Sequence, residues 1–310
     1  MNLTQYIIRR LLFAIPVIFI VTVLSFLIIH MAPGEPIELL VNPRMLKNPE
    51  IVNSIRKKYG LNKPLYIQYF VWLKNICRGD LGKSLYLKQP ISNLLMQRWP
   101  NSLNLALAGL FISYIIGVPA GIISAINRGT ALDFFSMLFA LVGLAIPSFW
   151  LALLLMLVFS VNLGWFPIGG YGSLRALVLP AIAYGAYSAA ENARVTRSSM
   201  LEVLNKDYIR TARAKGLVER VVLYKHAFRN ALIPLISLLG MRINWLLGGA
   251  VAIEVVFARP GLGRLLVNSV YRRDYPVIQI LILLFAIGVV FGNLAADVLY
   301  ALSDPQITYD

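Results

Sequence analysis

The chain alternates between long, uncharged, apolar runs and shorter segments in which the charged residues gather. A helix needs about 20 predominantly apolar residues to cross the hydrocarbon core of a bilayer. Four runs meet that length: Leu11–Met31, Trp99–Asn127, Phe134–Ser160 and Tyr275–Ala296. The third run stays uncharged as far as Leu174, but Asn162, Gly164 and the segment 167–172 break it, so we end its span at about Ser160. The pattern predicts a membrane helix in each of these runs.

Two weaker runs complete the pattern. Ala176–Ala190 is short, but a helix that continues as far as Arg197 can place its charged end in the headgroups and the cytosol by snorkelling. Leu232–Phe257 is largely apolar and is interrupted by Arg242 and Glu254. We therefore predict six transmembrane helices and an all-α membrane protein.

Basic residues set the orientation of such a protein, because short cytosolic loops carry an excess of Lys and Arg. With the N-terminus inside, the inner short loops hold twelve basic residues and the outer short loops hold five. The segment 32–98 holds eleven more, but it is longer than the loops to which the rule applies. The count predicts that both termini are cytosolic and that the segment 32–98 is extracytoplasmic.

Composition agrees with a membrane protein. Hydrophobic residues make up 58% of the 310 residues and charged residues 14%, whereas roughly 25% of an ordinary soluble domain is charged. The net charge of +15 lies in blocks between apolar runs, which favours membrane orientation over nucleic-acid binding. The single cysteine, Cys77, excludes an intrachain disulfide, and with only two histidines, His30 and His226, the usual metal cages are excluded.

We divide the chain into a first transmembrane helix (1–31), an extracytoplasmic helical segment (32–98) and a five-helix core (99–310) with a cytosolic loop at 198–231. Proline at helix starts and glycine at helix ends predict three short helices in the outer segment. They are Pro49–Tyr59, a helix from Pro64 that ends at Gly79, and Pro90–Arg98.

Two local features suggest chemistry that the rest of the sequence does not support. Gly82, Lys83 and Ser84 resemble the end of a phosphate-binding loop, but Cys77 occupies the place where such a loop needs its first glycine. His226 lies among basic residues without a nearby acid or nucleophile pattern. We interpret the tripeptide as an ordinary turn and the histidine as a solvated or interface residue. The sequence gives no indication of an enzyme.

The cytosolic loop before the fifth span contains a short capped helix. Asp207 is placed to accept hydrogen bonds from the first turn, and Gly216 is placed to end the helix in a left-handed conformation. Tyr208, Ile209 and Ala212 share one face, so the helix can offer an apolar stripe flanked by cations to a partner. The alternative is a helix that lies on anionic headgroups.

These residues carry a resemblance to a known family. The segment Tyr208–Leu217, with sequence YIRTARAKGL, is followed by Arg229–Pro234, with sequence RNALIP. Both resemble the cytosolic coupling loop of permeases in ATP-binding-cassette importers, specifically the dipeptide, oligopeptide and nickel branch. Further segments are similar to that branch along essentially the whole chain: Ile8–Arg10, Gly60–Tyr66, Phe257–Arg264, Arg273–Gln279 and Asp304–Pro305.

The resemblance has one departure. Importer permeases generally carry Glu-Ala-Ala, three residues and Gly, whereas Arg210, Thr211 and Ala212 fill the first three places here. The distance from Gly216 to Pro234 is also longer than the general pattern. The Ala and Gly positions match, but no role for an acidic residue follows.

The resemblance implies a type I importer permease that forms half of a translocation pathway. Its implied partners are a homologous second permease, two cytosolic ATPases that bind ATP and Mg, and an extracytoplasmic binding protein, while this subunit binds no cofactor or metal itself. We expect it to lie in a bacterial or archaeal cytoplasmic membrane. The expected ATPase-coupling residues are Asp207, Tyr208, Ile209, Arg210, Thr211, Ala212, Arg213, Lys215 and Gly216.

Two other sets of residues are candidates on the basis of position. Arg242 lies about ten residues into the fifth span, so it should face the bundle interior, as a pathway residue or as a structural partner of another span. The outer loops offer candidates for docking the binding protein: Arg259, Arg264, Arg272 and Arg273.

The resemblance favours peptides as cargo and leaves nickel or a metal chelate as the alternative. A secondary transporter would need coupling-ion ligands at mid-membrane, where only Arg242 has the right depth. A membrane-anchored sensor would need a signalling domain, which the sequence does not indicate.

Overall fold

The computed structural model describes residues 3–31, Ser54, 62–243 and 250–303. Every regular element in this part of the chain is a helix, and its strand-like feature is an isolated antiparallel bridge between Lys83 and Pro90. The all-α class predicted from the apolar runs is therefore confirmed for the described residues.

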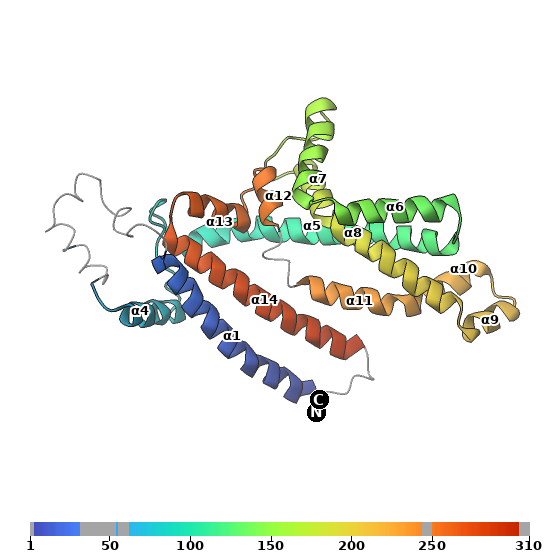
Figure 1. The fold of residues 1–310 in the computed structure, drawn as a ribbon, viewed down its shortest axis with the longest axis horizontal. Coiled ribbons are helices and arrows are strands. Elements are labelled where there is room, and N and C mark those ends of the chain that lie inside the picture. The colour runs from blue at the N-terminus through green and yellow to red at the C-terminus, as the bar shows by residue number, and fades with distance from the viewer. Residues whose placement is uncertain (1–2, 32–53, 55–61, 244–249, 304–310) are drawn as a thin grey trace.

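Helices α5 (Ile91–Ile126) and α8 (Leu174–Leu204) make the most extensive helix contact in the described chain and form its centre (Figure 1). Glycines on α5 allow the two backbones to approach closely. A Cβ atom added at Gly117 would lie 2.3 Å from the carbonyl oxygen of Ala189, and one at Gly121 would lie 2.5 Å from that of Ala193. Small residues have this role in many membrane helix pairs. The contact fixes the register of α5 against α8.

Helices α1 (Leu3–Met31) and α14 (Tyr275–Ser303) run antiparallel and in contact along one side of the molecule (Figure 1). Helix α4 (Leu65–Cys77) packs on α1, where the hydroxyls of Thr22 and Tyr69 share a hydrogen bond of 2.7 Å. Gly79 follows α4 with a φ of +83°, as expected for a glycine that ends a helix. The helix predicted from Pro64 to Gly79 is therefore confirmed.

The apolar run expected to form the third span is bent. It forms α6 (Ala131–Ala145), α7 (Ser148–Leu155) and a π-helix η2 (Met156–Asn162), and the two halves meet at 108°. Pro147 explains the break, because a residue before proline is driven out of the helical region, and Ile146 is extended, with φ −82° and ψ 124°. The run does not form the single helix that we expected from Phe134 to Ser160.

Two other boundaries differ from expectation. The short helix expected at Pro90–Arg98 is not separate, because α5 continues through residue 98 into the second apolar run. The run Leu232–Phe257 contains α11 (Arg229–Ile243) and α12 (Val251–Val256), and residues 244–249 between them lie outside the described part. The helix expected at Pro49–Tyr59 also lies outside it, apart from Ser54.

Within the described residues, three helices are long and apolar enough to cross a membrane, and the bent pair brings the number to four if it counts as one span. The three are Ile8–Leu27, Ile91–Ile126 and Tyr275–Ala296. They correspond to the first, second and last predicted spans.

Some of the short helices lie toward the two ends of the long axis, whereas α7 and α12 lie near its middle (Figure 1). Helices α9 (Asp207–Ala214) and α10 (Glu219–Val221) lie at one end, close to the turn between α5 and α6. The π-helix η3 (Val222–Phe228) leads from α10 into α11. Helices α4 and α13 (Leu262–Tyr271) lie toward the opposite end. The two ends therefore carry the loops that the charge count assigns to the cytosol and to the outside.

Candidate coupling loop and transport cavity

The predicted loop helix is present as α9, and its C-terminal end has the expected geometry. Gly216 has a φ of +73°, and its amide donates to the carbonyl of Arg213 at 2.9 Å. The N-terminal end differs from expectation. Lys206 occupies the cap position without a side-chain cap bond, and the Asp207 carboxylate instead accepts from Arg210 at 3.5 Å. Asp207 is thus an exposed first-turn residue, where its charge still suits the positive end of the helix dipole.

The apolar stripe of α9 faces the chain's own core. Ile209 and Ala212 are buried in one cluster with Met200 of α8 and with Val222 and Ala227 of η3. The expectation that this stripe is offered to a partner is therefore wrong for these two residues. Their burial anchors α9 to the end of α8 and to η3.

The opposite face of α9 is open to solvent. Tyr208, Arg210, Thr211 and Lys215 are exposed, and the Tyr208 hydroxyl accepts a hydrogen bond of 3.1 Å from the Asn230 amide on α11. This polar, cation-rich surface, and not the apolar stripe, is the face of α9 that remains exposed.

An ion pair closes the loop behind α9. Arg213 donates to both carboxylate oxygens of Glu219, at 3.2 and 2.7 Å. This hydrogen bonding lowers the pKa of the Glu219 carboxyl below its usual value. The pair is about half exposed, so its contribution to stability is small and falls with salt.

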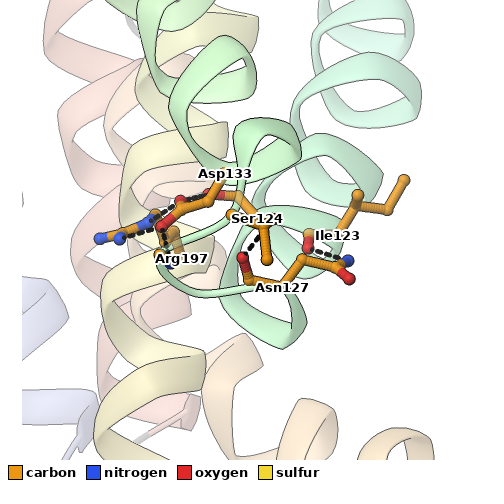
Figure 2. A network of polar contacts seen from close by, with 7 residues as sticks. Ile123, Ser124, Asn127, Asp133 and Arg197 are labelled. Carbon is orange, nitrogen blue, oxygen red and sulfur yellow. Dashed lines mark hydrogen bonds and ion pairs between the residues drawn. The ribbon is translucent and has the colours of Figure 1, made fainter.

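A polar network joins α5, α6 and α8 at the same end of the molecule. Arg197 of α8 donates to both oxygens of Asp133, at 2.7 and 2.8 Å, and the Asp133 carboxylate also accepts from the Ser124 hydroxyl at 2.5 Å and the Gly129 amide at 3.0 Å. Figure 2 shows Arg197 and Ser124 approaching Asp133 from two different helices. We expected Arg197 to reach the headgroups, but it holds a carboxylate instead. The network fastens α6 to the α5–α8 pair about two turns before the end of α8 at Leu204.

Sequence reasoning missed Asp133 as a structural residue. The local signal was an acidic residue in a first helical turn after Gly129 and Thr130, which is the usual place for a carboxylate that accepts backbone amides. Its pairing with Arg197, 64 residues away, has no local signal.

Arg242 faces the interior, as predicted. Its guanidinium donates to the Glu191 carboxylate of α8 at 2.7 Å, and its side chain is only 12% exposed. The pair borders a cavity of about 510 Å³ between α5, α8 and α11, a volume within the usual range of ligand pockets. The cavity is lined by Ala106, Gly109, Leu110, Ser148, Tyr184, Gly185, Tyr187, Ser188, Glu191, Leu238, Met241 and Arg242.

At the opposite end, the loop after α12 is folded around a buried carboxylate. Glu254 is 1% exposed and accepts from the Ser102 hydroxyl at 2.6 Å and from the Arg264 amide at 3.0 Å. Gly261 leaves room for this carboxylate, because an added Cβ would lie 2.2 Å from it and the carboxylate would have to shift. The segment Phe257–Arg264, one of the family-like motifs, is thus a loop that binds Glu254.

The four arginines proposed for docking have different environments. Arg259 is 3% exposed and donates to the Ala176 carbonyl at 3.3 Å, so it is unavailable for docking and that expectation is wrong. Arg264 is partly buried and donates to the Ala258 carbonyl. Arg272 and Arg273 are exposed, and the Arg272 guanidinium lies 3.8 Å from the centre of the Tyr86 ring. Arg272 and Arg273 therefore remain candidates for docking.

Among the described residues, no three His, Cys, Asp or Glu side chains lie close enough together to hold a metal ion. Ser84, from the tripeptide that imitates a phosphate loop, donates its hydroxyl to Asp274. Ser84 thus has a structural partner, in agreement with the interpretation of the tripeptide as an ordinary turn.

Comparison with family models decides what kind of protein this is. Residues 117–309 match the model described as the binding-protein-dependent transport system inner membrane component, and residues 3–106 match the model of its N-terminal part. The chain belongs to this family. The resemblance drawn from the loop motifs is confirmed at this level, and the family is one of transport permeases.

Named relatives extend over the whole chain. The oligopeptide transport system permease protein AppB of Bacillus subtilis is 45% identical, over 99% of this chain and 100% of that protein. The glutathione transport system permease protein GsiC of Escherichia coli is 44% identical, over 98% of this chain and 99% of that protein. Among solved structures, a chain of the MetNI methionine ABC transporter in an inward-facing conformation covers 68% of this permease and 96% of its own length, with a TM-score of 0.58 and 21% identity. That likeness supports the fold alone.

Proposed function

We propose that the protein is one of two permease subunits of an ATP-driven importer for di- or oligopeptides. The observation that carries this proposal is the identity of 44–45%, over essentially the full length, to permeases named for oligopeptide and glutathione transport. Glutathione is itself a small peptide, so both names favour a peptide cargo over nickel or a metal chelate. In this scheme the subunit is a transport component and not an enzyme, and it binds no cofactor.

The proposed partners follow from the two ends of the molecule. The exposed face of α9 docks on one of two cytosolic ATPase subunits, which bind ATP and Mg. The surface around Arg272 and Arg273 docks an extracytoplasmic binding protein that delivers the peptide. A second, homologous permease completes the pathway around the cavity beside Arg242.

The proposed topology has six spans with both termini in the cytosol of a bacterial or archaeal cell. It is supported by the charge count and by the arrangement of the loops, since α9, α10 and the α5–α6 turn lie at one end while α4 and α13 lie toward the other (Figure 1). The bent pair α6–α7 and the charged helix α8 supply two of the six spans.

ATP binding drives transport in this proposal by moving α9. Because Ile209 and Ala212 are buried against α8 and η3, a push on the exposed face of α9 is passed to α8 and, through η3, to α11. Those two helices border the cavity. A two-state change of this kind is biased by nucleotide at one end and by the loaded binding protein at the other.

Reconstitution tests the function. The complete complex, with second permease, ATPases and binding protein, is placed in proteoliposomes, and uptake of labelled dialanine and of a labelled nickel complex is measured with ATP, without ATP and with an ion gradient alone. ATP-dependent uptake of the dipeptide is expected. Uptake of the nickel complex alone, or uptake driven by the gradient without ATP, would contradict the proposal.

A further inference from the structure

The cavity beside Arg242 contains one cation and one anion on an otherwise neutral wall. Of its twelve lining residues, Arg242 and Glu191 are the charged ones. Small and apolar side chains from α5 and α11 form much of the rest, while Ser148, Ser188 and the tyrosines of α8 contribute hydroxyls. A wall of this composition suits a small ligand that has a polar, neutral body and one charged group of each sign.

The ion pair does not use all the hydrogen-bonding capacity of Arg242. Nη2 donates to Glu191, whereas Nη1 is buried and has no hydrogen-bond partner among the described residues. An unmet buried donor on a cation is costly, because hydrogen bonds to charged groups are stronger than neutral ones. Arg242 therefore has an unused donor, Nη1, that can hydrogen-bond a second carboxylate once the contact between Arg242 and Glu191 opens.

Glu191 is the more accessible partner. Its side chain is 28% exposed, against 12% for Arg242, and it lies on α8, one helical turn after the cavity residues Tyr187 and Ser188. A ligand ammonium can thus approach the carboxylate from the cavity.

We propose that this cavity holds the peptide in transit by its two charged ends, with the α-carboxylate on Arg242 and the α-ammonium on Glu191. The inference rests on the proposed function, since it names the substrate groups that the permease itself contacts. Before a peptide arrives, Arg242 and Glu191 neutralise each other. A zwitterion that enters between them leaves each charge with a partner of opposite sign, so no charge is stranded in the membrane interior during the exchange.

The rival explanation is a structural tether between α8 and α11. A tether predicts that loss of either charge affects all substrates equally. Contact with the two peptide termini predicts that each variant fails only with peptides that rely on the missing charge.

Thiol protection separates the two explanations without relying on transport. The probe site is Ser188→Cys in a Cys77→Ser background, because Ser188 lines the cavity and Cys77 is the only native cysteine of this chain. In the complete complex without nucleotide, the rate at which a small maleimide labels this subunit is measured with four probes: dialanine, N-acetyl-dialanine, dialanine amide and N-acetyl-dialanine amide.

We expect dialanine to slow labelling several-fold and the doubly capped peptide to leave it unchanged. Arg242→Gln should abolish protection by N-acetyl-dialanine, which offers only a carboxylate, and spare protection by dialanine amide. Glu191→Gln should give the converse pattern. Arg242→Lys keeps the charge and should retain part of the protection by N-acetyl-dialanine.

Three results would overturn the inference: equal protection by all four peptides, no protection by any of them, or loss of protection in both variants regardless of capping. The uptake assay distinguishes this failure from failure of the proposed function. If the wild-type complex imports dialanine with ATP but shows no charge-dependent protection, the transit site is wrong and the peptide function stands. If it imports no peptide, the function itself is wrong.

Discussion

Ser84 and Asp274 are 190 residues apart in the chain, and the Ser84 hydroxyl donates a hydrogen bond to the Asp274 carboxylate. The same carboxylate accepts from the Leu85 amide at 3.0 Å and the Tyr86 amide at 3.4 Å. Asp274 immediately precedes α14, so it fastens the turn after α4 to the start of the last helix. Two motifs that are distant in the sequence thus form one corner of the molecule.

Removing that carboxylate should destabilise this corner. Asp274→Ala leaves the buried Ser84 hydroxyl and two backbone amides without their acceptor. We expect these unsatisfied groups to lower the free energy of unfolding by about 1–3 kcal/mol. Thermal unfolding of the purified complex measures it. Asp80→Ala is the matched control, because Asp80 is exposed and accepts from Gly82 within its own turn. Equal changes of melting temperature in the two variants would show that the Asp274 hydrogen bonds contribute no more to stability than those of an exposed aspartate.

The Asp133–Arg197 pair should require the planar guanidinium of arginine and not only its positive charge. Arg197→Lys keeps the charge but cannot make both hydrogen bonds to the carboxylate. We therefore expect it to lower the free energy of unfolding nearly as much as Arg197→Ala does. Because Asp133 is buried and Arg197 is partly exposed, Arg197→Ala should lower the free energy of unfolding by about 1–3 kcal/mol, which is less than for a fully buried pair. Melting curves for the single variants and for Asp133→Asn combined with Arg197→Ala give the coupling energy.

An exposed pair on the same helix end serves as the reference for this measurement. Lys206 and Glu202 lie 3.1 Å apart with both side chains largely in solvent, so Glu202→Gln should change stability by less than about 1 kcal/mol. If Arg197→Lys behaves like this surface variant, the shape of the guanidinium is unimportant.

Gly216→Val should abolish ATP-driven uptake and leave the subunit in the membrane. A branched side chain at a φ of +73° costs about 1–2 kcal/mol and forces the end of α9 to change direction. Uptake and transport-stimulated ATPase activity in proteoliposomes measure the effect. Gly216→Asn is the control, since asparagine tolerates the left-handed conformation and should retain most of the activity. Wild-type uptake by Gly216→Val would exclude a coupling role for α9.

The native cysteine reports the orientation. Cys77 is exposed at the end of α4, so a membrane-impermeant maleimide should label it in intact cells and should fail to label Cys77→Ser. Arg210→Cys in the Cys77→Ser background places a thiol on the exposed face of α9, which should react only in inverted vesicles. The reverse pattern would mean that the charge count gives the wrong orientation.

Local rules predicted local structure well. The presence of α9, its C-terminal end and the left-handed Gly216 follow from capping and from the composition of one short segment, whereas the N-terminal cap at Asp207 was predicted wrongly. The interior direction of Arg242 follows equally directly from the cost of a charge in lipid. Pro147 could also have been used, because the residue before a proline avoids the helical region, and that alone locates the bend between α6 and α7.

Partnerships across the chain could not be predicted in this way. The stripe on α9 shows that Ile209 needs an apolar neighbour, but periodicity does not tell whether that neighbour belongs to the same chain or to another. Likewise, Arg197 and Arg259 read as surface cations until folding brings Asp133 and the Ala176 carbonyl beside them. Such contacts depend on how the helices pack, which no single segment encodes.

The close fit of α5 and α8 also has a consequence for biosynthesis. The Asn192 amide on α8 donates to the Ser113 carbonyl on α5 at 3.2 Å, and these residues are separated by 79 positions in the chain. A ribosome that adds ~5–20 residues per second needs roughly 4–16 s to cover that distance. Throughout that interval the glycine-lined face of α5 is already made while its partner is not. The newly synthesised α5 must therefore be covered by the insertion machinery or by lipid until α8 emerges. A translational pause before residue 192 would lengthen the time during which α5 lacks its partner helix.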